Sequence, residues 1–393
     1  MARLNCCKAG SVLLKLFLTA VCLFGGLYLY DFFAGGLGFT GWSRNRTAFL
    51  VTTVLLVVLC AALFWAGIIL LYTTCDQLRL KKRVLGLVLA WVPVANLVML
   101  IDLIVTADRE YRFEKARLRR DAARRERQIC RTRYPLLLVH GVFFRDFKHL
   151  NYWGRIPKAL EQNGAQIFYG EHNSASSVAE SAAQLKERIT RLVNETGCGK
   201  VNIIAHSKGG LDARCLLSDP SAAACVASVT TINAPHRGCK FADWLLEKVP
   251  ARQQEQLARA YNAAAARLGD REPDFLAAVR DLTAESCRER NKVLRDPEGV
   301  LCRSVGSVQR RAVSGRFPLN LTHRFVKYFD GENDGLVGTG SFAWGERLTM
   351  LRASGRRGIS HGDVIDLNRE NIPGFDVREF YVQLAAELKE AGL

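Results

Sequence analysis

The sequence predicts an α/β fold, with a mostly parallel and doubly wound sheet, that follows a helical membrane region. Composition is the first indication, because long apolar segments give way to a charged chain near residue 107. Beyond residue 133, short apolar runs such as 134–140 and 226–232 alternate with amphipathic segments, as strands joined by helices do. Residues 201–205 form another such run, which leads into Ser207 and a pair of glycines. We therefore expect a membrane region at 1–107 and a second domain at 134–393.

Three apolar segments of the first region, residues 11–30, 47–72 and 84–107, are each long enough to span a bilayer at ~20 residues per span. The first has the charge order of a signal peptide, but no small-residue cleavage pattern follows it, which favours an uncleaved helix. The third holds Pro93 and Asn96 near its centre, which fit a helix in a bundle and also fit a re-entrant hairpin. The sequence thus predicts a multi-pass protein of the cell membrane.

Positive charge is concentrated beside these segments. Residues 1–133 hold 20 Lys and Arg against 8 Asp and Glu, and eleven of these cations lie between Arg109 and Arg133. Residues 108–133 are expected to form a basic helical linker that faces anionic headgroups or acts only as a charged spacer. Nucleic acid is the weaker partner, because aromatic residues are not interleaved with the basic run. With three spans, six cations on one face oppose thirteen on the other, which predicts a cytoplasmic second domain.

Twelve cysteines are scattered along the chain without a Cys-x-x-Cys pair. Such spacing matches neither a zinc site nor a small disulfide framework. Reduced and partly buried thiols are the expected state.

The second domain is expected to begin with a strand at 134–140, followed by a loop that carries Phe143 and Phe144. A helix near 156–163, a strand at 166–169 and an amphipathic helix at 176–193 come next. This order of elements is that of parallel strands connected by helices.

After the strand at 226–232, an Ala- and Arg-rich helical stretch at about 242–308 interrupts the alternation. An insertion after a sheet strand often covers a site, so a lid is expected here. Late strands are expected at 312–313 and 324–328, and a closing helix at 375–391.

Ser207 lies where a strand meets a helix, in VNIIAHSKGG. A serine at such a corner projects its hydroxyl from the sheet, and small residues two positions before and after it let the backbones approach. This is the nucleophile elbow of an α/β-hydrolase, with Ala205 in place of the usual first glycine. Because A-x-S-x-G recurs by chance, a downstream acid and histidine must support the assignment.

Acyl transfer by serine needs a base that reaches the hydroxyl, an acid that orients the base, and two amide donors for the oxyanion. In α/β-hydrolases the chain order is serine, acid, histidine. Asp334, in the loop GENDGLVG, and His361, in SHGDV, follow Ser207 in that order. The predicted triad is therefore Ser207, Asp334 and His361.

Other acids and histidines compete for these roles. Asp330 and Glu332 share the acid loop, but Asp334 occupies the tight N-D-G turn. His323 precedes the acid in the chain, and His206 adjoins the nucleophile and is interpreted as structural. His140 is expected to brace the oxyanion loop through a hydrogen bond.

The oxyanion donors are expected to be the backbone amides of Val142, which follows His-Gly, and of Lys208, which follows the nucleophile. The side chain of Lys208 is expected to be solvated, or else to attract an anionic headgroup.

Six motifs occur in an order and at a spacing that resembles bacterial triacylglycerol lipases of the Burkholderia and Pseudomonas type: YPLLLVHGVFF, YWGRIPKALEQNGAQIF, VNIIAHSKGG, INAPHRG, NDGLVG and SHGDVIDL. The resemblance covers about residues 134–393. It implies an α/β-hydrolase fold with a helical lid, hydrolysis of lipid esters, and the same roles for Ser207, Asp334, His361, Val142 and Lys208.

Two departures concern stabilising features of those lipases. Asp363 matches one ligand of their structural calcium, but Leu367 replaces another, so the resemblance leaves calcium doubtful. Gly340 replaces a half-cystine, so their disulfide is absent, which agrees with a reducing compartment.

The sequence as a whole predicts a membrane-anchored serine hydrolase that cleaves carboxylic esters of lipids through an acyl-serine and needs no cofactor for its chemistry. Phe143 and Phe144, with the insertion, are expected to bind the acyl chain. Two alternatives stay open: an acyltransferase with the same triad, and a non-catalytic membrane scaffold with this fold.

Overall fold

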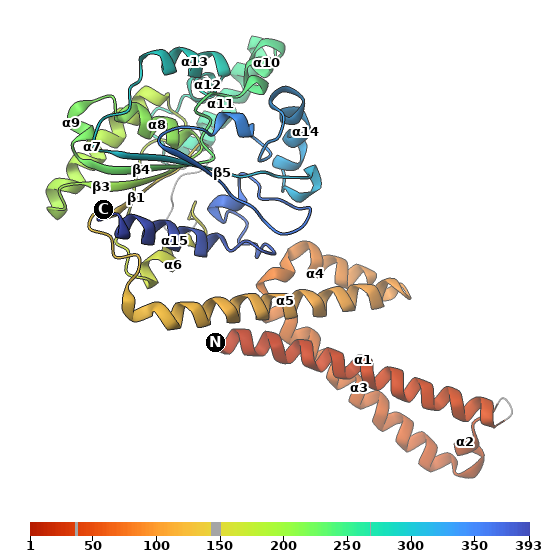
Figure 1. The fold of residues 1–393 in the computed structure, drawn as a ribbon. Coiled ribbons are helices and arrows are strands. Elements are labelled where there is room, and N and C mark those ends of the chain that lie inside the picture. Colours follow the sequence, from red (N-terminus) through yellow and green to blue (C-terminus); the bar gives the residue numbers. More distant parts are fainter. Residues whose placement is uncertain (36–37, 143–150, 268) are drawn as a thin grey trace. The chain divides into compact units, whose positions relative to one another are not determined.

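The computed structural model describes residues 1–35, 38–142, 151–267 and 269–393 (Figure 1). The chain divides into two compact units, Met1–Ala122 and Ala123–Leu393. Phe143 and Phe144, the expected substrate-binding residues, lie outside the described residues.

Two long apolar helices of the first unit pack against each other: α1 (Ala2–Ala34) and α3 (Arg46–Thr74), which are connected through the short α2 (Thr40–Arg44) (Figure 1). Glycines allow the contact, because a Cβ atom on Gly10 would lie 2.4 Å from Leu71 Cδ1, and one on Gly67 would lie 2.7 Å from Leu14 Cγ. Among the described residues, α1 and α3 are the helices long and apolar enough to cross a membrane.

The predicted span at 84–107 is not one continuous helix. α4 (Arg79–Val88) passes into the 3-10 turn η2 (Leu89–Trp91), and α5 (Ala95–Arg124) begins after Pro93. Proline has no N–H to continue the helical ladder, and Val94 adopts a φ of 67°, so the chain turns here. Two helices joined by this turn have the form of the hairpin that the sequence left open as an alternative to a span. α5 and the 3-10 turn η3 (Arg125–Arg127) then carry the helix through most of the basic linker.

Polar contacts attach α5 to the first turns of α1. Asp108 accepts hydrogen bonds from Lys8 Nζ at 3.1 Å and from Ser11 Oγ at 2.7 Å, and it also pairs with Lys15. These three donors lie on one face of α1 because they are spaced by three and four residues.

The second unit contains a six-stranded parallel sheet in the order β2-β1-β3-β4-β5-β6. The strands are β1 (Leu136–Val139), β2 (Ile167–Tyr169), β3 (Val201–His206), β4 (Val226–Ile232), β5 (Leu301–Gly306) and β6 (Arg347–Met350). The two central strands β3 and β4 are buried along their whole length, as parallel strands covered on both faces are. The predicted α/β fold is confirmed.

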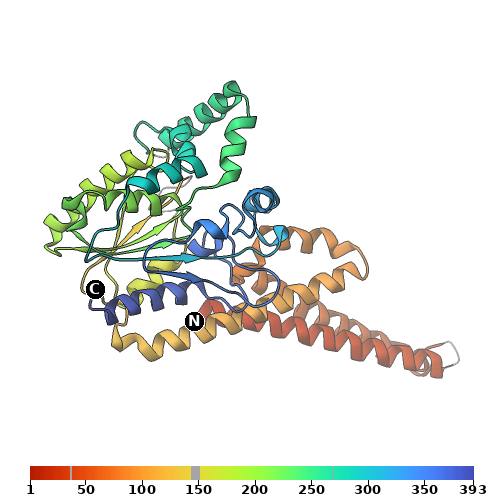
Figure 2. The ribbon, with the colours of Figure 1, turned by 45° about the horizontal axis from the view of Figure 1, so that its top comes forward.

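Helices cover both faces of the sheet (Figures 1 and 2). α6 (Ile156–Gln162) and α15 (Val377–Glu390) pack on one face, against side chains such as Leu138 and Ile204. α7 (Val178–Thr196) and α8 (Lys208–Leu216) pack on the other, against the alternate residues Val139 and Ile203. Two apolar cores thus hold the strand ends in fixed positions, because side chains alternate between the faces of a sheet.

The insertion is helical but shorter than predicted. Its helices are α10 (Lys240–Lys248), α11 (Ala251–Arg267), α12 (Phe275–Arg280) and α13 (Ala284–Val293), which lie together on the side of the sheet away from α15 (Figures 1 and 2). The chain then returns to the sheet as β5. Carboxylates fasten the insertion to the loop before α7: Asp270 accepts from the amides of Ser174 and Ala175, and Asp281 accepts from the amide of Val178.

The two predicted late strands are wrong. Residues 312–313 lie in the 3-10 turn η4 (Ala312–Ser314), and residues 324–328 lie in the helix α14 (Leu319–Asp330). In α14, His323 and Val326 are three residues apart and both point into the domain, which is the period of a helix and not of a strand. β5 and β6 complete the sheet instead.

Candidate active site

Ser207 occupies a sharp turn between β3 and α8. Its backbone has φ 57° and ψ −131°, a conformation that costs a non-glycine residue free energy and therefore needs support from its surroundings. Gly209 and Gly210 provide the space, because a Cβ atom on the first would lie 2.4 Å from the carbonyl oxygen of His140 and one on the second 2.4 Å from Ala234 Cβ. α8 can therefore start directly against β1 and the end of β4.

Asp334 is held rigidly in the loop after α14. Its Oδ1 accepts hydrogen bonds from the amides of Leu336 and Val337 at 2.9 and 2.8 Å, and its Oδ2 accepts one from Asn233 Nδ2 at 2.6 Å. The same Oδ2 lies 2.6 Å from Nδ1 of His361. Asp334 is fully buried, so its carboxylate can orient the imidazole without competition from water.

His361 lies beside the nucleophile turn. Its ring centroid is 4.5 Å from that of His206, the residue directly before Ser207. Asp334 engages Nδ1, which leaves Nε2 as the nitrogen for proton transfer. The structure therefore brings the serine, acid and histidine of the predicted triad to one place at the end of β3.

Tyr152 links the turn to the oxyanion loop. Its hydroxyl accepts a hydrogen bond from the amide of Gly141 at 3.0 Å and shares another with Nδ1 of His206 at 2.6 Å. Burial lowers the pKa of His206 well below its usual value, so the ring is neutral. The prediction that His206 is structural agrees with these contacts.

The expected oxyanion loop runs along the nucleophile. A Cβ atom on Gly141 would lie 2.8 Å from Ser207 Cβ, so the loop backbone is in contact with the serine. Val142 follows at once and is buried, while the amide of Lys208 is the first of α8. Val142 thus follows the residue that contacts Ser207, and Lys208 begins a helix whose N-terminus favours negative charge.

Comparison with known proteins agrees with this geometry. Residues 134–301 match the family model of the α/β-hydrolase fold. A triacylglycerol lipase of Vibrio cholerae is 31% identical over 289 residues, which cover 67% of this chain and 89% of that protein. A triacylglycerol lipase of Pseudomonas fragi is 32% identical over 296 residues, which cover 67% of this chain and 98% of that protein.

The chain belongs to the triacylglycerol lipase family. It is a carboxylic-ester hydrolase, and the predicted resemblance is confirmed. The crystal structure of Staphylococcus hyicus lipase shares the fold, with a TM-score of 0.51 at 17% identity over 66% of this chain and 97% of that one.

The side chain of Lys208 in this lipase is neither solvated nor available to a headgroup. It is buried, and its Nζ donates to Asp212 Oδ1 at 2.8 Å and to Ser181 Oγ at 2.9 Å. Asp212 lies one helical turn further along α8, so the pair is formed within one helix. Burial raises the pKa of Asp212 to about 6, although Lys208 opposes the shift. Lys208 is buried because α7 packs over the start of α8 and excludes water.

His140 makes the predicted hydrogen bond to the expected oxyanion loop. Its Nδ1 lies 2.9 Å from the carbonyl oxygen of Gly141, and its ring stacks on His172 with centroids 4.1 Å apart. Burial, and then the nearby His172, lower the pKa of His140 to about 3. The neutral ring thus fixes the loop without adding charge next to the oxyanion.

The residues around Asp363 do not fit a calcium ion. Arg357 donates to both carboxylate oxygens, at 2.7 and 3.2 Å, and the amide of Ser360 donates to Oδ2 at 2.8 Å. A guanidinium therefore already supplies the positive charge that a cation would bring, and Leu367 has no oxygen in its side chain to offer. Arg357 thereby fastens the loop that carries His361.

The competing acids and histidine have other partners. Asp330 accepts from the amides of Lys240 and Phe241 at the start of α10, and Glu332 is exposed. His323 donates through Nε2 to the carbonyl oxygen of Gln309 at 2.8 Å.

The sequence did not indicate the roles of Asn233, which donates to Asp334, and of Tyr152, which contacts Gly141 and His206. Asn233 could have been noticed, since it is a polar residue at the carboxyl end of a buried strand.

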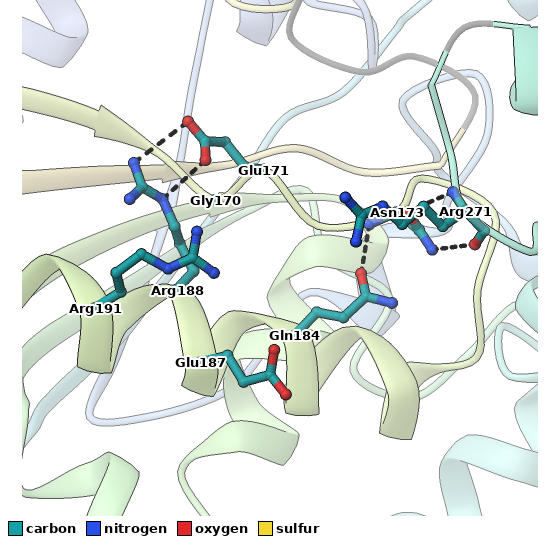
Figure 3. A pocket seen from close by; sticks show the side chains of 8 residues that line it. All are labelled: Gly170, Glu171, Asn173, Gln184, Glu187, Arg188, Arg191 and Arg271. Atoms are coloured by element: carbon teal, nitrogen blue, oxygen red, sulfur yellow. Dashed lines mark hydrogen bonds and ion pairs between the residues drawn. The ribbon is translucent and has the colours of Figure 1, made fainter.

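A polar cavity of about 350 Å³ lies apart from the triad, at the edge of the sheet between β2 and α7 (Figure 3). Glu171 pairs there with Arg188, and Asn173 exchanges hydrogen bonds with the backbone of Arg271. Charged side chains line most of it, so it does not resemble an acyl-chain pocket.

Gly141 provides a test of the oxyanion loop. We expect Gly141→Ala to lower kcat for a soluble ester by about 10²-fold, because the new methyl group would displace the loop from Ser207 and misplace one donor. Gly340→Ala is the control, since no atom lies within 4 Å of its Cβ position. Equal kcat values for the two variants would contradict this role for the loop.

Proposed function

We propose that this lipase is a membrane-anchored serine hydrolase of lipid esters. The hydrogen bond between Asp334 and His361, next to the turn that carries Ser207, is the observation that supports the mechanism most directly. The lipid substrate class is proposed because both bacterial relatives are named triacylglycerol lipases.

In the proposed reaction, Ser207 Oγ attacks the ester carbonyl carbon while His361 Nε2 takes the hydroxyl proton. The amides of Val142 and Lys208 donate to the oxyanion, and Asp334 stabilises the imidazolium. His361 then returns the proton to the leaving alcohol, which gives an acyl-serine. Water, activated by His361 in the same way, releases the free acid and restores the serine. No step requires a cofactor or a metal ion.

α1 and α3 are long and apolar enough to cross a membrane, which supports the proposed anchor. As two spans they would form a hairpin with both ends on one side of the bilayer, together with Arg3, Lys8, Arg79, Lys81, Lys82 and Arg83. Only Arg44 and Arg46 flank the connecting loop. Six cations against two favour a cytoplasmic location for the chain ends and for the hydrolase domain.

Product analysis distinguishes hydrolysis from acyl transfer. We expect the full chain in lipid nanodiscs to release free fatty acid from an isotope-labelled triacylglycerol or phospholipid, with EDTA present and at unchanged rate. A labelled long-chain alcohol is added as a competing acceptor. If the main product were the ester of that alcohol, the protein would be an acyltransferase and not a hydrolase. If neither product formed, the result would support the non-catalytic scaffold.

A further inference from the structure

An exposed face formed by η4 and α14 is unusually apolar for a water-facing surface. Its apolar side chains are Val313, Phe317, Leu321, Phe325 and Tyr328, which are 84%, 79%, 55%, 53% and 85% exposed. Within α14, Leu321, Phe325 and Tyr328 follow each other at spacings of four and three residues, so they share one side of the helix. The opposite side, with Val326, packs into the domain. α14 is thus apolar on its buried side and again on its outer side, which solvent alone does not explain.

The same face is strongly cationic. Residues 309–329 contain five Arg and Lys and no Asp or Glu. Arg316 pairs with Glu370, but the exposed Arg324 and Lys327, which precede and follow Phe325 in the chain, pair with no acid in the described part of the protein. Exposed aromatic rings interleaved with unpaired cations are typical of surfaces that lie in the headgroup layer of anionic membranes.

The face adjoins the catalytic loops. α14 ends at Asp330, four residues before Asp334, and Thr322 of α14 donates to the carbonyl oxygen of Gly335. Leu319 Cδ1 lies 3.7 Å from the Cβ position of Gly362, the neighbour of His361. Phe325 also stacks on Phe241 of α10, with ring centroids 6.0 Å apart. A membrane held by this face would therefore be next to the acid loop, the histidine loop and the first helix of the insertion.

We propose that the η4–α14 face docks the hydrolase domain on an anionic phospholipid bilayer, with Phe317, Phe325 and Tyr328 at the level of the acyl-chain boundary and Arg324 and Lys327 among the headgroups. The inference rests on the proposed membrane anchor, which would keep the domain close to such a surface. Docking through this face is a second contact with the bilayer, separate from α1 and α3, and it brings the site to its substrate.

Photo-crosslinking of the full chain identifies what covers the face. p-Benzoyl-phenylalanine is placed at position 328 in nanodiscs that contain phosphatidylglycerol. The control is position 293 at the end of α13, where Val293 is also apolar and is 74% exposed. We expect lipid adducts at 328 with a yield several-fold above that at 293. Equal yields would overturn the proposal. Adducts with protein at 328 would also overturn it and would indicate a second copy or a protein partner.

A charge-reversal variant separates docking from catalysis. We expect Arg324→Glu with Lys327→Glu to lower the lipid adduct yield at 328, and to slow hydrolysis of a bilayer-borne ester about tenfold or more, since each cation near an anionic surface contributes to binding. Hydrolysis of water-soluble p-nitrophenyl acetate should stay within about twofold of wild type, because no residue of the site is altered. Unchanged hydrolysis of the bilayer-borne ester in this variant would contradict docking. If the wild type itself did not hydrolyse the soluble ester, the proposed function would be contradicted instead.

Discussion

The substitution Ser207→Ala is expected to lower kcat for ester hydrolysis by about 10³-fold or more and to abolish covalent labelling by a fluorophosphonate. The reason is that Ser207 supplies the hydroxyl at the strained turn, against the backbone of Gly141 and next to His206, whose ring lies beside that of His361. Removal of the nucleophile in a triad leaves only the rate contributed by binding and by the oxyanion donors.

The measurement is kcat for a soluble ester, together with labelling of the purified full chain. Ser218→Ala, an exposed serine just beyond α8, is the matched control and should retain both activities. His361→Ala should weaken the labelling, because the hydroxyl loses its base. Equal labelling of Ser207→Ala and wild type would show that the nucleophile is a different residue.

Replacement of Lys208 should give the largest loss of stability. Lys208→Met leaves Asp212 buried without its cation, which costs about 3 kcal/mol in comparable buried pairs. For a domain of this size, such a loss lowers Tm by about 6–12 °C. Lys208→Met combined with Asp212→Leu should recover more than half of the loss, since an apolar pair of similar volume often replaces a buried ion pair.

The matched control is Lys186→Met, which removes a lysine from an exposed pair with Asp219. Exposed pairs contribute little, so its Tm should change by no more than about 2 °C. If Lys208→Met changed Tm as little as Lys186→Met, the buried pair would not stabilise the domain.

The Tm deficit of Lys208→Met should also depend on pH. The pKa of Asp212 is already raised to about 6 by burial, and loss of Lys208 removes the group that opposes this shift. An acid whose pKa is higher in the folded than in the unfolded protein contributes stability below its unfolded pKa and loses it as pH rises through the folded value. The deficit should therefore shrink as pH is lowered from 8 towards 5, when Asp212 becomes protonated.

Sequence motifs were enough to predict Ser207, Asp334 and His361 as the triad, because the chemistry of acyl transfer restricts residue type and chain order together. The structure adds the hydrogen bond between Asp334 and His361 beside the turn that carries Ser207. The sheet strands up to β4 were also predictable from their apolar, β-branched runs. β5 was not, because Leu301–Gly306 contains Arg303 and Ser304 and follows directly on a charged segment. The strand predicted at 324–328 is wrong because the apolar residues of α14 are dense enough to obscure the helical period.

The broken helix near Pro93 shows a different limit. Sequence indicated both a span and a hairpin, and local backbone geometry favours the hairpin, since η2 and the positive φ of Val94 turn the chain. Residue preferences near Pro93 allow either a span or a hairpin, but which of them forms depends on how α4 and α5 pack.

The order of residues in the chain was enough to predict the class of fold and a candidate triad, since periodicity indicates the first and motif order the second. Tertiary structure alone decided the state of Lys208, the partners of Asp363, and the contacts of Asn233 and Tyr152. Those properties depend on which segments distant in the chain exclude water or supply a donor. A buried ammonium and a solvated one have the same sequence, and only the packing of α7 on α8 distinguishes them.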